Sequence, residues 1–251
     1  GAPYVYDYDY ICFVHDKKTA QLKPYCVGES FSYKCFINNL GSKEYVENII
    51  STFECNPRLG LLTPPPPNHG SFYQIVGSEW ASNYENTLAL ATKLKLKCNI
   101  FFDKEPIAPL GTMFWFRPKA LSPLFDFGWS FEDFPKEPNG VDGTLLHAIE
   151  RIYAFVVQDQ GFYPAWVMTD RCAEIEMTNL HFMLRELNQK LFSQYYTSTL
   201  LDMTETMNQN MKFSYRTRKA VKGKIKRVIP KPIWAVMKKI YHFFGGKKWV
   251  G

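Results

Sequence analysis

Short runs of β-forming residues alternate with longer stretches of helical periodicity along most of this chain. The β-rich runs cover residues 8–14, 58–63, 112–116 and 163–168, and helical spacing is found at 28–40, 43–53, 83–96, 143–157 and 173–195. Alternation of this kind is typical of α/β proteins, in which helices flank a mostly parallel or mixed sheet. The sequence therefore predicts one α/β domain over residues 1–196.

Two of these helices carry start signals. Ser42 can cap the helix at 43–53 and Asp142 the helix at 143–157, because short polar side chains accept N–H groups of the first turn. Each helix has its apolar residues on one face. These faces comprise Tyr45, Val46, Ile49, Ile50 and Phe53 in the first helix, and Leu145, Ile149, Ile152 and Val156 in the second. We expect both faces to point inward.

Charge is distributed unevenly. The net charge is +6, yet residues 212–251 hold 13 of the 30 Lys and Arg residues and no Asp or Glu, which leaves a formal charge of −7 on the rest. A basic tail on an acidic body needs an anionic partner or an acidic face. We predict no nucleic-acid partner, because the acidic body would repel phosphates and no nucleic-acid-binding motif is visible.

We assign residues 197–251 to a linker and a basic, amphipathic, helical tail. Apolar residues with helical spacing follow Pro232, and lysines flank them. The apolar residues are Ile233, Trp234, Val236, Met237, Ile240, Tyr241, Phe243 and Phe244. The segment is too short to span a bilayer, so we expect it to lie on an anionic membrane surface. Packing of the same face on the acidic body is the alternative.

The six cysteines are scattered, and no pair has the CxxC spacing of a zinc site. No signal peptide is visible. We therefore predict reduced thiols and a cytoplasmic protein, peripheral at the inner face of the cell membrane.

Two segments join polar residues to predicted strands. His15-Asp16-Lys17-Lys18 follows the first β run, where imidazole and carboxylate can hold a divalent cation and lysines can meet phosphate. A solvated turn is the alternative. Gly111 opens the run that ends at Arg117-Pro118, and a glycine there lets a ligand approach closely. A buried strand with a snorkelling arginine is the alternative.

Two further segments carry carboxylates. Residues 131–137 set Glu132, Asp133 and Glu137 among aromatic residues, and apolar surroundings raise a carboxylate pKa and favour a general base. A surface turn is the alternative. In the segment 142–151, His147 lies one helical turn before the pair at 150 and 151. There, a helix cap for Asp142 and a core histidine for His147 are the alternatives.

Taken in order, the four segments resemble the rhamnan synthesis protein F family. That family has a strand ending in H-D-K-K/S, then G-T-M-F-W-F-R-P, then E-D-F-P-x-E, then D-G-T-x-x-H-A-I-E-R. The matching residues here are 14–18, 111–118, 132–137 and 142–151. The resemblance covers roughly residues 6–170, about two thirds of the chain.

The resemblance implies a nucleotide-sugar glycosyltransferase with a GT-A-like mixed sheet, of which the N-terminal nucleotide-binding half is absent before Gly1. His15 and Asp16 then stand where such enzymes carry a metal-binding acidic motif, here with a single carboxylate. Asp133 stands at the position of the base, with Glu132 beside it. The implied cofactor is Mg²⁺ or Mn²⁺, held by Asp16 and His15.

The implied reaction is inverting transfer of a deoxyhexose, L-rhamnose from dTDP-rhamnose, to a lipid-linked glycan of the cell surface. The residues expected at the donor diphosphate are His15, Asp16, Lys17, Arg117 and His147. The residues expected at the acceptor are Trp115, Trp129, Phe131 and Asp142, with aromatic rings stacking on the sugar. A non-catalytic carbohydrate-binding or scaffold domain of the same pathway is the alternative function.

Overall fold

The computed structural model describes residues 2–16, 25–68, 77–136 and 142–192. The chain divides into two compact units, Gly1–Met183 and Leu184–Gly251, and the second is described only as far as residue 192. Lys17 and the whole of the predicted tail lie outside the described residues.

A four-stranded mixed sheet forms the centre of the first unit, in the order β1-β3-β2-β4. The strands are β1 (Ile11–Phe13), β2 (Leu59–Thr63), β3 (Phe114–Phe116) and β4 (Tyr163–Trp166). Strand β3 runs antiparallel to both β1 and β2, while β2 and β4 are parallel. The predicted α/β class with a mixed sheet is confirmed, although the strands are shorter than the β-rich runs.

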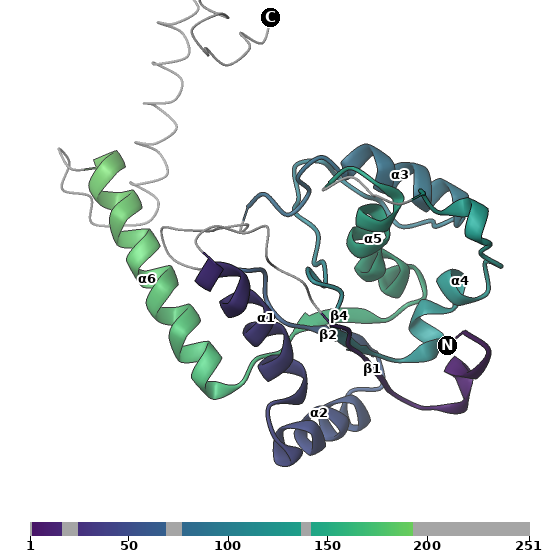
Figure 1. The fold of residues 1–251 in the computed structure, drawn as a ribbon, viewed down its shortest axis with the longest axis horizontal. Helices are drawn as coiled ribbons and strands as arrows, with labels where there is room; N and C mark the ends of the chain where they lie inside the picture. The colour runs from purple at the N-terminus through teal and green to yellow at the C-terminus, as the bar shows by residue number, and fades with distance from the viewer. Residues whose placement is uncertain (1, 17–24, 69–76, 137–141, 193–251) are drawn as a thin grey trace, which may run out of the picture. The chain divides into compact units, whose positions relative to one another are not determined.

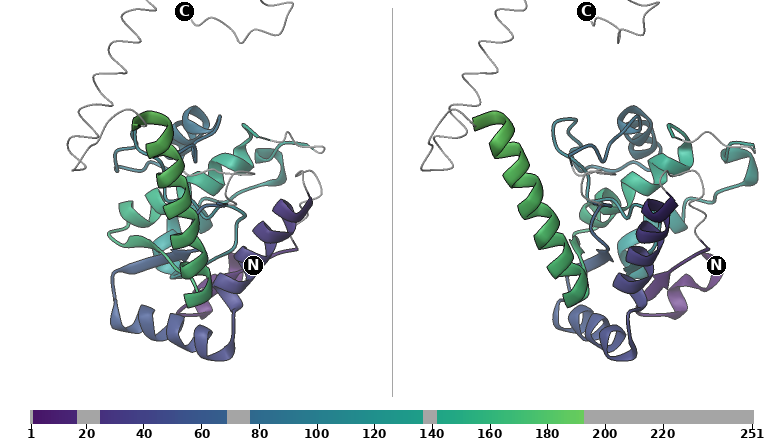
Figure 2. Two further views of the ribbon diagram at one scale, coloured as in Figure 1. Left: turned by 90° about the vertical axis from the view of Figure 1, so that its left-hand side faces the viewer. Right: turned by 60° about the vertical axis from the view of Figure 1, so that its left-hand side comes forward.

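The described residues form six α-helices. They are α1 (Tyr25–Leu40), α2 (Lys43–Cys55), α3 (Tyr84–Lys93), α4 (Ser122–Phe125), α5 (Leu145–Asp159) and α6 (Asp170–Phe192). Short 3₁₀ helices cover η1 (Ala2–Asp7), η2 (Pro118–Leu121) and η3 (Phe131–Asp133). Figure 1 shows α1 and α2 on one side of the sheet and α3, α4 and α5 on the other. In the views of Figure 2, too, α2 and α3 lie on opposite sides of the strands.

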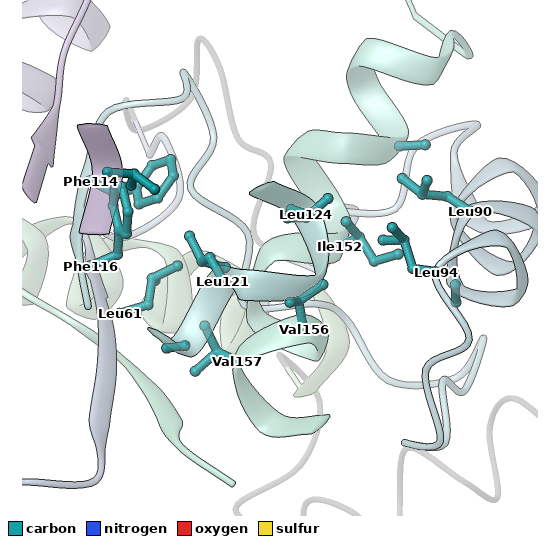
Figure 3. Packing of buried hydrophobic residues seen from close by; sticks show 14 residues of the cluster. Leu61, Leu90, Leu94, Phe114, Phe116, Leu121, Leu124, Ile152, Val156 and Val157 are labelled. Carbon is teal, nitrogen blue, oxygen red and sulfur yellow. The ribbon is translucent and has the colours of Figure 1, made fainter. Parts of the chain in front are cut away.

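Alternation along β3 explains the two layers, because successive strand residues point to opposite faces of a sheet. Phe114 and Phe116 enter the same core cluster as Ile152 and Val156 of α5, and Figure 3 draws Leu61 and Leu121 between the two pairs. Trp115 points the other way and packs with the buried face of α2. The sheet is therefore covered on both faces, as its continuous apolar runs indicate.

Gly60 lets α5 and η2 approach the middle of β2. A Cβ atom at this position would lie 2.7 Å from Val157 Cγ1, 2.7 Å from Phe162 Cβ and 2.9 Å from Ala120 Cβ. These atoms lie within two bonds of the backbone of packed residues, so a change of side-chain rotamer cannot move them far enough away. Only glycine fits between the sheet and the helix layer here.

We expect Gly60→Ala to lower the free energy of unfolding by about 1–3 kcal/mol, the usual cost of inserting a carbon into a packed core. Urea unfolding of the variant beside the wild type measures this difference. Equal midpoints and slopes would mean that β2 and α5 move apart without cost, contrary to the packing at Gly60.

None of the helices among the described residues is both long enough and apolar enough to cross a membrane.

Candidate functional site

The segment before β3 has an unusual backbone. Gly111 has φ of +94° and Thr112 has φ of +54°, so two consecutive residues adopt the left-handed region. Glycine does so freely, but a β-branched residue there is rare and strained. Such strain persists only where the surroundings fix it, and it gathers at functional sites. The strain at this turn therefore indicates a functional site.

Glu150 of α5 holds the turn from one side. Its Oε1 accepts a hydrogen bond from the Gly111 backbone N–H at 2.7 Å and from the Thr112 hydroxyl at 3.3 Å. Its Oε2 pairs with the guanidinium of Arg151, and the two side chains are only 15% and 7% exposed. Arg151 Nε in turn donates to the Glu79 backbone carbonyl at 3.1 Å. The carboxylate is thus paired at both oxygens.

His15 holds the turn from the other side. Its Nε2 lies 2.9 Å from the Gly111 carbonyl oxygen, and its Nδ1 lies 3.1 Å from the backbone carbonyl of Asp16. Asp16 itself is exposed to solvent. Three of the four segments singled out in the sequence therefore meet at one turn. We call His15, Gly111, Thr112, Glu150 and Arg151 the Gly111 site.

The described residues do not build a metal centre at this place. Both ring nitrogens of His15 face carbonyl oxygens, so the ring offers no lone pair to a cation in this arrangement. Across the described part of the chain, no three His, Cys, Asp or Glu side chains gather in a way that could hold a metal ion. The expectation that His15 and Asp16 hold Mg²⁺ or Mn²⁺ therefore finds no support in the arrangement of these two side chains.

Asp133 is in η3 and not at the Gly111 site; it lies beside Lys93 at the C-terminal end of α3. Its Oδ1 accepts from Lys93 Nζ at 2.7 Å, and its Oδ2 accepts from the Ser130 N–H at 2.9 Å and the Ser130 hydroxyl at 3.1 Å. Lys93 first, and then Ser130, lower the pKa of Asp133 to about 2. The expected rise in the pKa of this carboxylate is therefore wrong, because cationic and polar partners outweigh the aromatic surroundings. The backbone and Ser130 also lower the pKa of the exposed Glu132.

The aromatic residues of this segment form a cluster around the same lysine. Lys93 Nζ lies 5.0 Å from the ring centre of Phe127 and 5.1 Å from that of Trp129. Trp129 packs on Phe127 and Phe134 and donates from its indole N–H to a backbone carbonyl at 2.8 Å. Phe131 does not join this packing and is 94% exposed. It is the member of the predicted acceptor set whose ring is open to a ligand.

Asp142 fastens α5 to α3 and does not cap α5. Thr144 occupies the N-cap position, so the predicted cap is wrong. The Asp142 carboxylate accepts from the Asn83 amide at 2.6 Å and from the backbone N–H and hydroxyl of Ser82. Burial raises the pKa of Asp142, but the hydrogen bonds from Ser82 and Asn83 outweigh it and lower the pKa to about 2. This position is at the opposite end of α3 from Asp133, about 15 Å away at 1.5 Å per helical residue.

We expect Asp142→Asn to destabilise the protein near neutral pH and to have no effect near pH 2. A carboxylate whose folded pKa is depressed stabilises the fold above its unfolded pKa of about 4, and that stabilisation is lost as the pH falls toward about 2. Urea unfolding of wild type and variant at several pH values measures the difference. Asp103→Asn, at an exposed position, is the control. A difference that does not change with pH would contradict the ionic role.

Arg117 and Trp115 have structural contacts. Arg117 donates to the backbone carbonyls of Phe53 at 2.6 Å and Leu59 at 2.9 Å, so it caps the end of α2. Trp115 is 7% exposed and donates to the Asn39 carbonyl at 3.0 Å. His147, half-buried, pairs through Nδ1 with the Thr144 hydroxyl at 2.8 Å. The structure does not bring these three side chains to the Gly111 site.

Sequence reasoning missed a buried ion pair and a buried glutamate. Lys34 of α1 pairs with Glu176 of α6, and both are nearly buried. Glu79, 5% exposed, lies beside Glu105, and burial and then this neighbouring carboxylate raise the pKa of Glu79. The only signal for either was a single charge within an apolar stretch, such as Lys34 between Tyr33 and Cys35, and such a signal does not identify the partner.

Comparisons with known proteins agree with the sequence resemblance. Residues 3–162 match the family described as rhamnan synthesis protein F. Two curated proteins of Xanthomonas campestris pv. campestris, one from strain B100 and one from strain ATCC 33913, are each described as "Uncharacterized protein WxcX". Each is 32% identical over 116 residues, which is 46% of this chain and 16% of the relative. No solved structure matches the chain significantly.

Proposed function

Because the chain belongs to the rhamnan synthesis protein F family, we propose that it is the glycosyltransferase part of a rhamnan-building protein. Membership implies a part in rhamnan polysaccharide synthesis. The proposed reaction is transfer of a deoxyhexose, L-rhamnose from dTDP-rhamnose, to a lipid-linked glycan with inversion at the anomeric carbon. A GT-A-like fold belongs to the same proposal.

The convergence of three segments on the Gly111 turn is the observation that carries this proposal. His15 is fixed at the end of β1 with the exposed Asp16 beside it, at the sheet edge where α/β proteins bind ligands. To meet the diphosphate as it gathers negative charge on leaving, the imidazole must turn its Nδ1 from the Asp16 carbonyl toward the phosphate, while Gly111 keeps Nε2. Lys17, expected at the diphosphate from the sequence, lies outside the described residues.

Transfer needs a base that removes the proton of the acceptor hydroxyl, whose oxygen then attacks the anomeric carbon. By the family order we assign this role to Asp133. Its present contacts set a condition, because a carboxylate with a pKa of about 2 accepts protons poorly. Lys93 must release Asp133 when substrate binds. The exposed ring of Phe131 is the proposed stacking surface for the acceptor sugar.

The test is incubation of the 251-residue chain with labelled dTDP-rhamnose and a lipid-linked rhamnan acceptor. The proposal expects label in the glycan and release of the nucleoside diphosphate. Binding of the glycan without transfer, and without hydrolysis of the donor, would contradict it.

A non-catalytic carbohydrate-binding domain of the same pathway is the second candidate. One observation favours it: Asp133 is held by Lys93 and Ser130 while Phe131 stands open beside it. This candidate predicts that Phe131→Ala loses glycan binding and that no preparation transfers sugar. The transfer assay separates the two candidates.

We also propose that the basic tail docks on the anionic cytoplasmic face of the cell membrane. The sequence of the tail supports this, since each lysine or arginine near an anionic leaflet adds about 1 kcal/mol of attraction. The full chain is expected to float with anionic liposomes at low salt, whereas a chain ending at Asn210 is expected to remain below. Equal flotation of the two would contradict the docking.

A further inference from the structure

Building on the proposed function, we propose that Glu150, held by Arg151, is the positioning residue of the Gly111 site. It fixes the strained turn at Gly111 and Thr112, and through the Gly111 carbonyl it fixes the imidazole of His15. Glu150 itself does not touch the sugar nucleotide.

The turn at Gly111 and Thr112 needs contacts that hold its backbone. Two consecutive left-handed residues, one of them a threonine, revert to an ordinary conformation unless contacts hold them. Glu150 supplies two of those contacts, from the Gly111 N–H and the Thr112 hydroxyl, through one carboxylate oxygen.

Glu150 is itself held in place by the core and by Arg151. It lies on α5 between Ala148 and Ile152, both fully buried in the core. Its other oxygen is held by Arg151, which is itself tied to the Glu79 carbonyl. A carboxylate fixed on a packed helix, with both oxygens hydrogen-bonded, can orient its neighbours.

The Gly111 carbonyl in turn orients the imidazole of His15. A carbonyl oxygen only accepts hydrogen bonds, so the 2.9 Å contact with Gly111 places a proton on His15 Nε2. The left-handed Gly111 turns its N–H toward Glu150 and its carbonyl toward His15. When the turn relaxes, the carbonyl leaves His15, and the ring loses its orientation and the hydrogen bond that holds the proton on Nε2. Misplacement by about 1 Å at a reacting group can cost about 10²-fold in rate.

The experiment follows His15 directly by NMR of the full chain with ¹⁵N-labelled histidine. The signal is identified by its loss in a His15→Gln variant. Glu150→Gln keeps the shape of the side chain and removes its charge, and Glu54→Gln, an exposed glutamate of α2, is the matched control. Thr112→Val removes only the hydroxyl contact and keeps the size and the β-branch of the side chain, so it folds even if Glu150→Gln does not.

We expect the Nε2 signal of His15 to have the shift of a protonated nitrogen in the wild type and in the control. In Glu150→Gln it should move toward the shift of an unprotonated nitrogen, with transfer about 10²-fold lower. In Thr112→Val it should move less, in the same direction. An unmoved His15 signal in whichever of these variants folds would overturn the positioning role. A moved signal with no transfer even by the wild type would uphold it and refute the proposed function.

Discussion

Replacing Glu176 with leucine is expected to lower the free energy of unfolding by about 3–5 kcal/mol, the cost of leaving a buried charge without its partner. Lys34 and Glu176 are only 10% and 11% exposed in their side chains. Lys34 also donates to the Pro66 carbonyl at 3.1 Å, and the Asn68 amide donates to Glu176 at 3.3 Å. In Glu176→Leu the ammonium keeps only a neutral partner. Denaturant unfolding near neutral pH measures the loss.

Two controls separate the lost pair from lost packing. Lys34→Met combined with Glu176→Leu should recover most of the loss, because an apolar pair needs no charge compensation. The exposed pair of Lys43 and Glu47, 84% and 61% exposed, provides the surface equivalent. There, Glu47→Gln should cost less than about 1 kcal/mol. Equal destabilisation in the single and double variants would mean that packing at Glu176, and not its charge, holds α6.

The second large effect concerns catalysis. Asp133→Asn is expected to reduce sugar transfer by about 10²- to 10⁴-fold, the usual contribution of a general base. The fold should survive, because asparagine has nearly the same size and its Oδ1 can keep accepting from the Ser130 N–H. Transfer rates at saturating donor and acceptor measure the effect.

Lys93→Met is the matched control, because it removes the same ion pair from the other side. It also removes the largest cause of the low pKa of Asp133. If Asp133 is the base, this variant should keep or increase transfer. Equal losses in Asp133→Asn and Lys93→Met would show that the pair only anchors the aromatic cluster, and the assignment of the base would fail.

Local patterns predicted the elements well where one signal decides them. The helix at 43–53 appears as α2, with Ser42 accepting from the Tyr45 N–H at 3.1 Å and with Ile49 and Phe53 buried. The β-rich run at 58–63 is β2, and Ile152 and Val156 of the apolar face predicted at 143–157 are buried in α5, with Leu145 and Ile149 partly buried. In each case the periodicity of apolar residues reports burial, and burial is what the fold requires.

Long-range partners could not be predicted, because spacing along the chain does not show which carbonyl or carboxylate a side chain will meet. Asp142 had the composition of a helix cap but binds Ser82 and Asn83, 60 and 59 residues away in the sequence. Arg117 had the appearance of a phosphate ligand but caps α2. Glu150 was visible only as a neighbour of His147, and its contact with Gly111 depends on how α5 packs on the sheet.

Binding of dTDP-rhamnose to the 251-residue chain tests the central claim, that the Gly111 site receives a nucleotide sugar, most directly. Calorimetric titration of the wild type should give saturable binding with one site per chain. His15→Ala should weaken that binding, and the exposed Glu54→Gln should leave it unchanged. Equal affinity in the wild type and in His15→Ala, or no binding by either, would contradict the account.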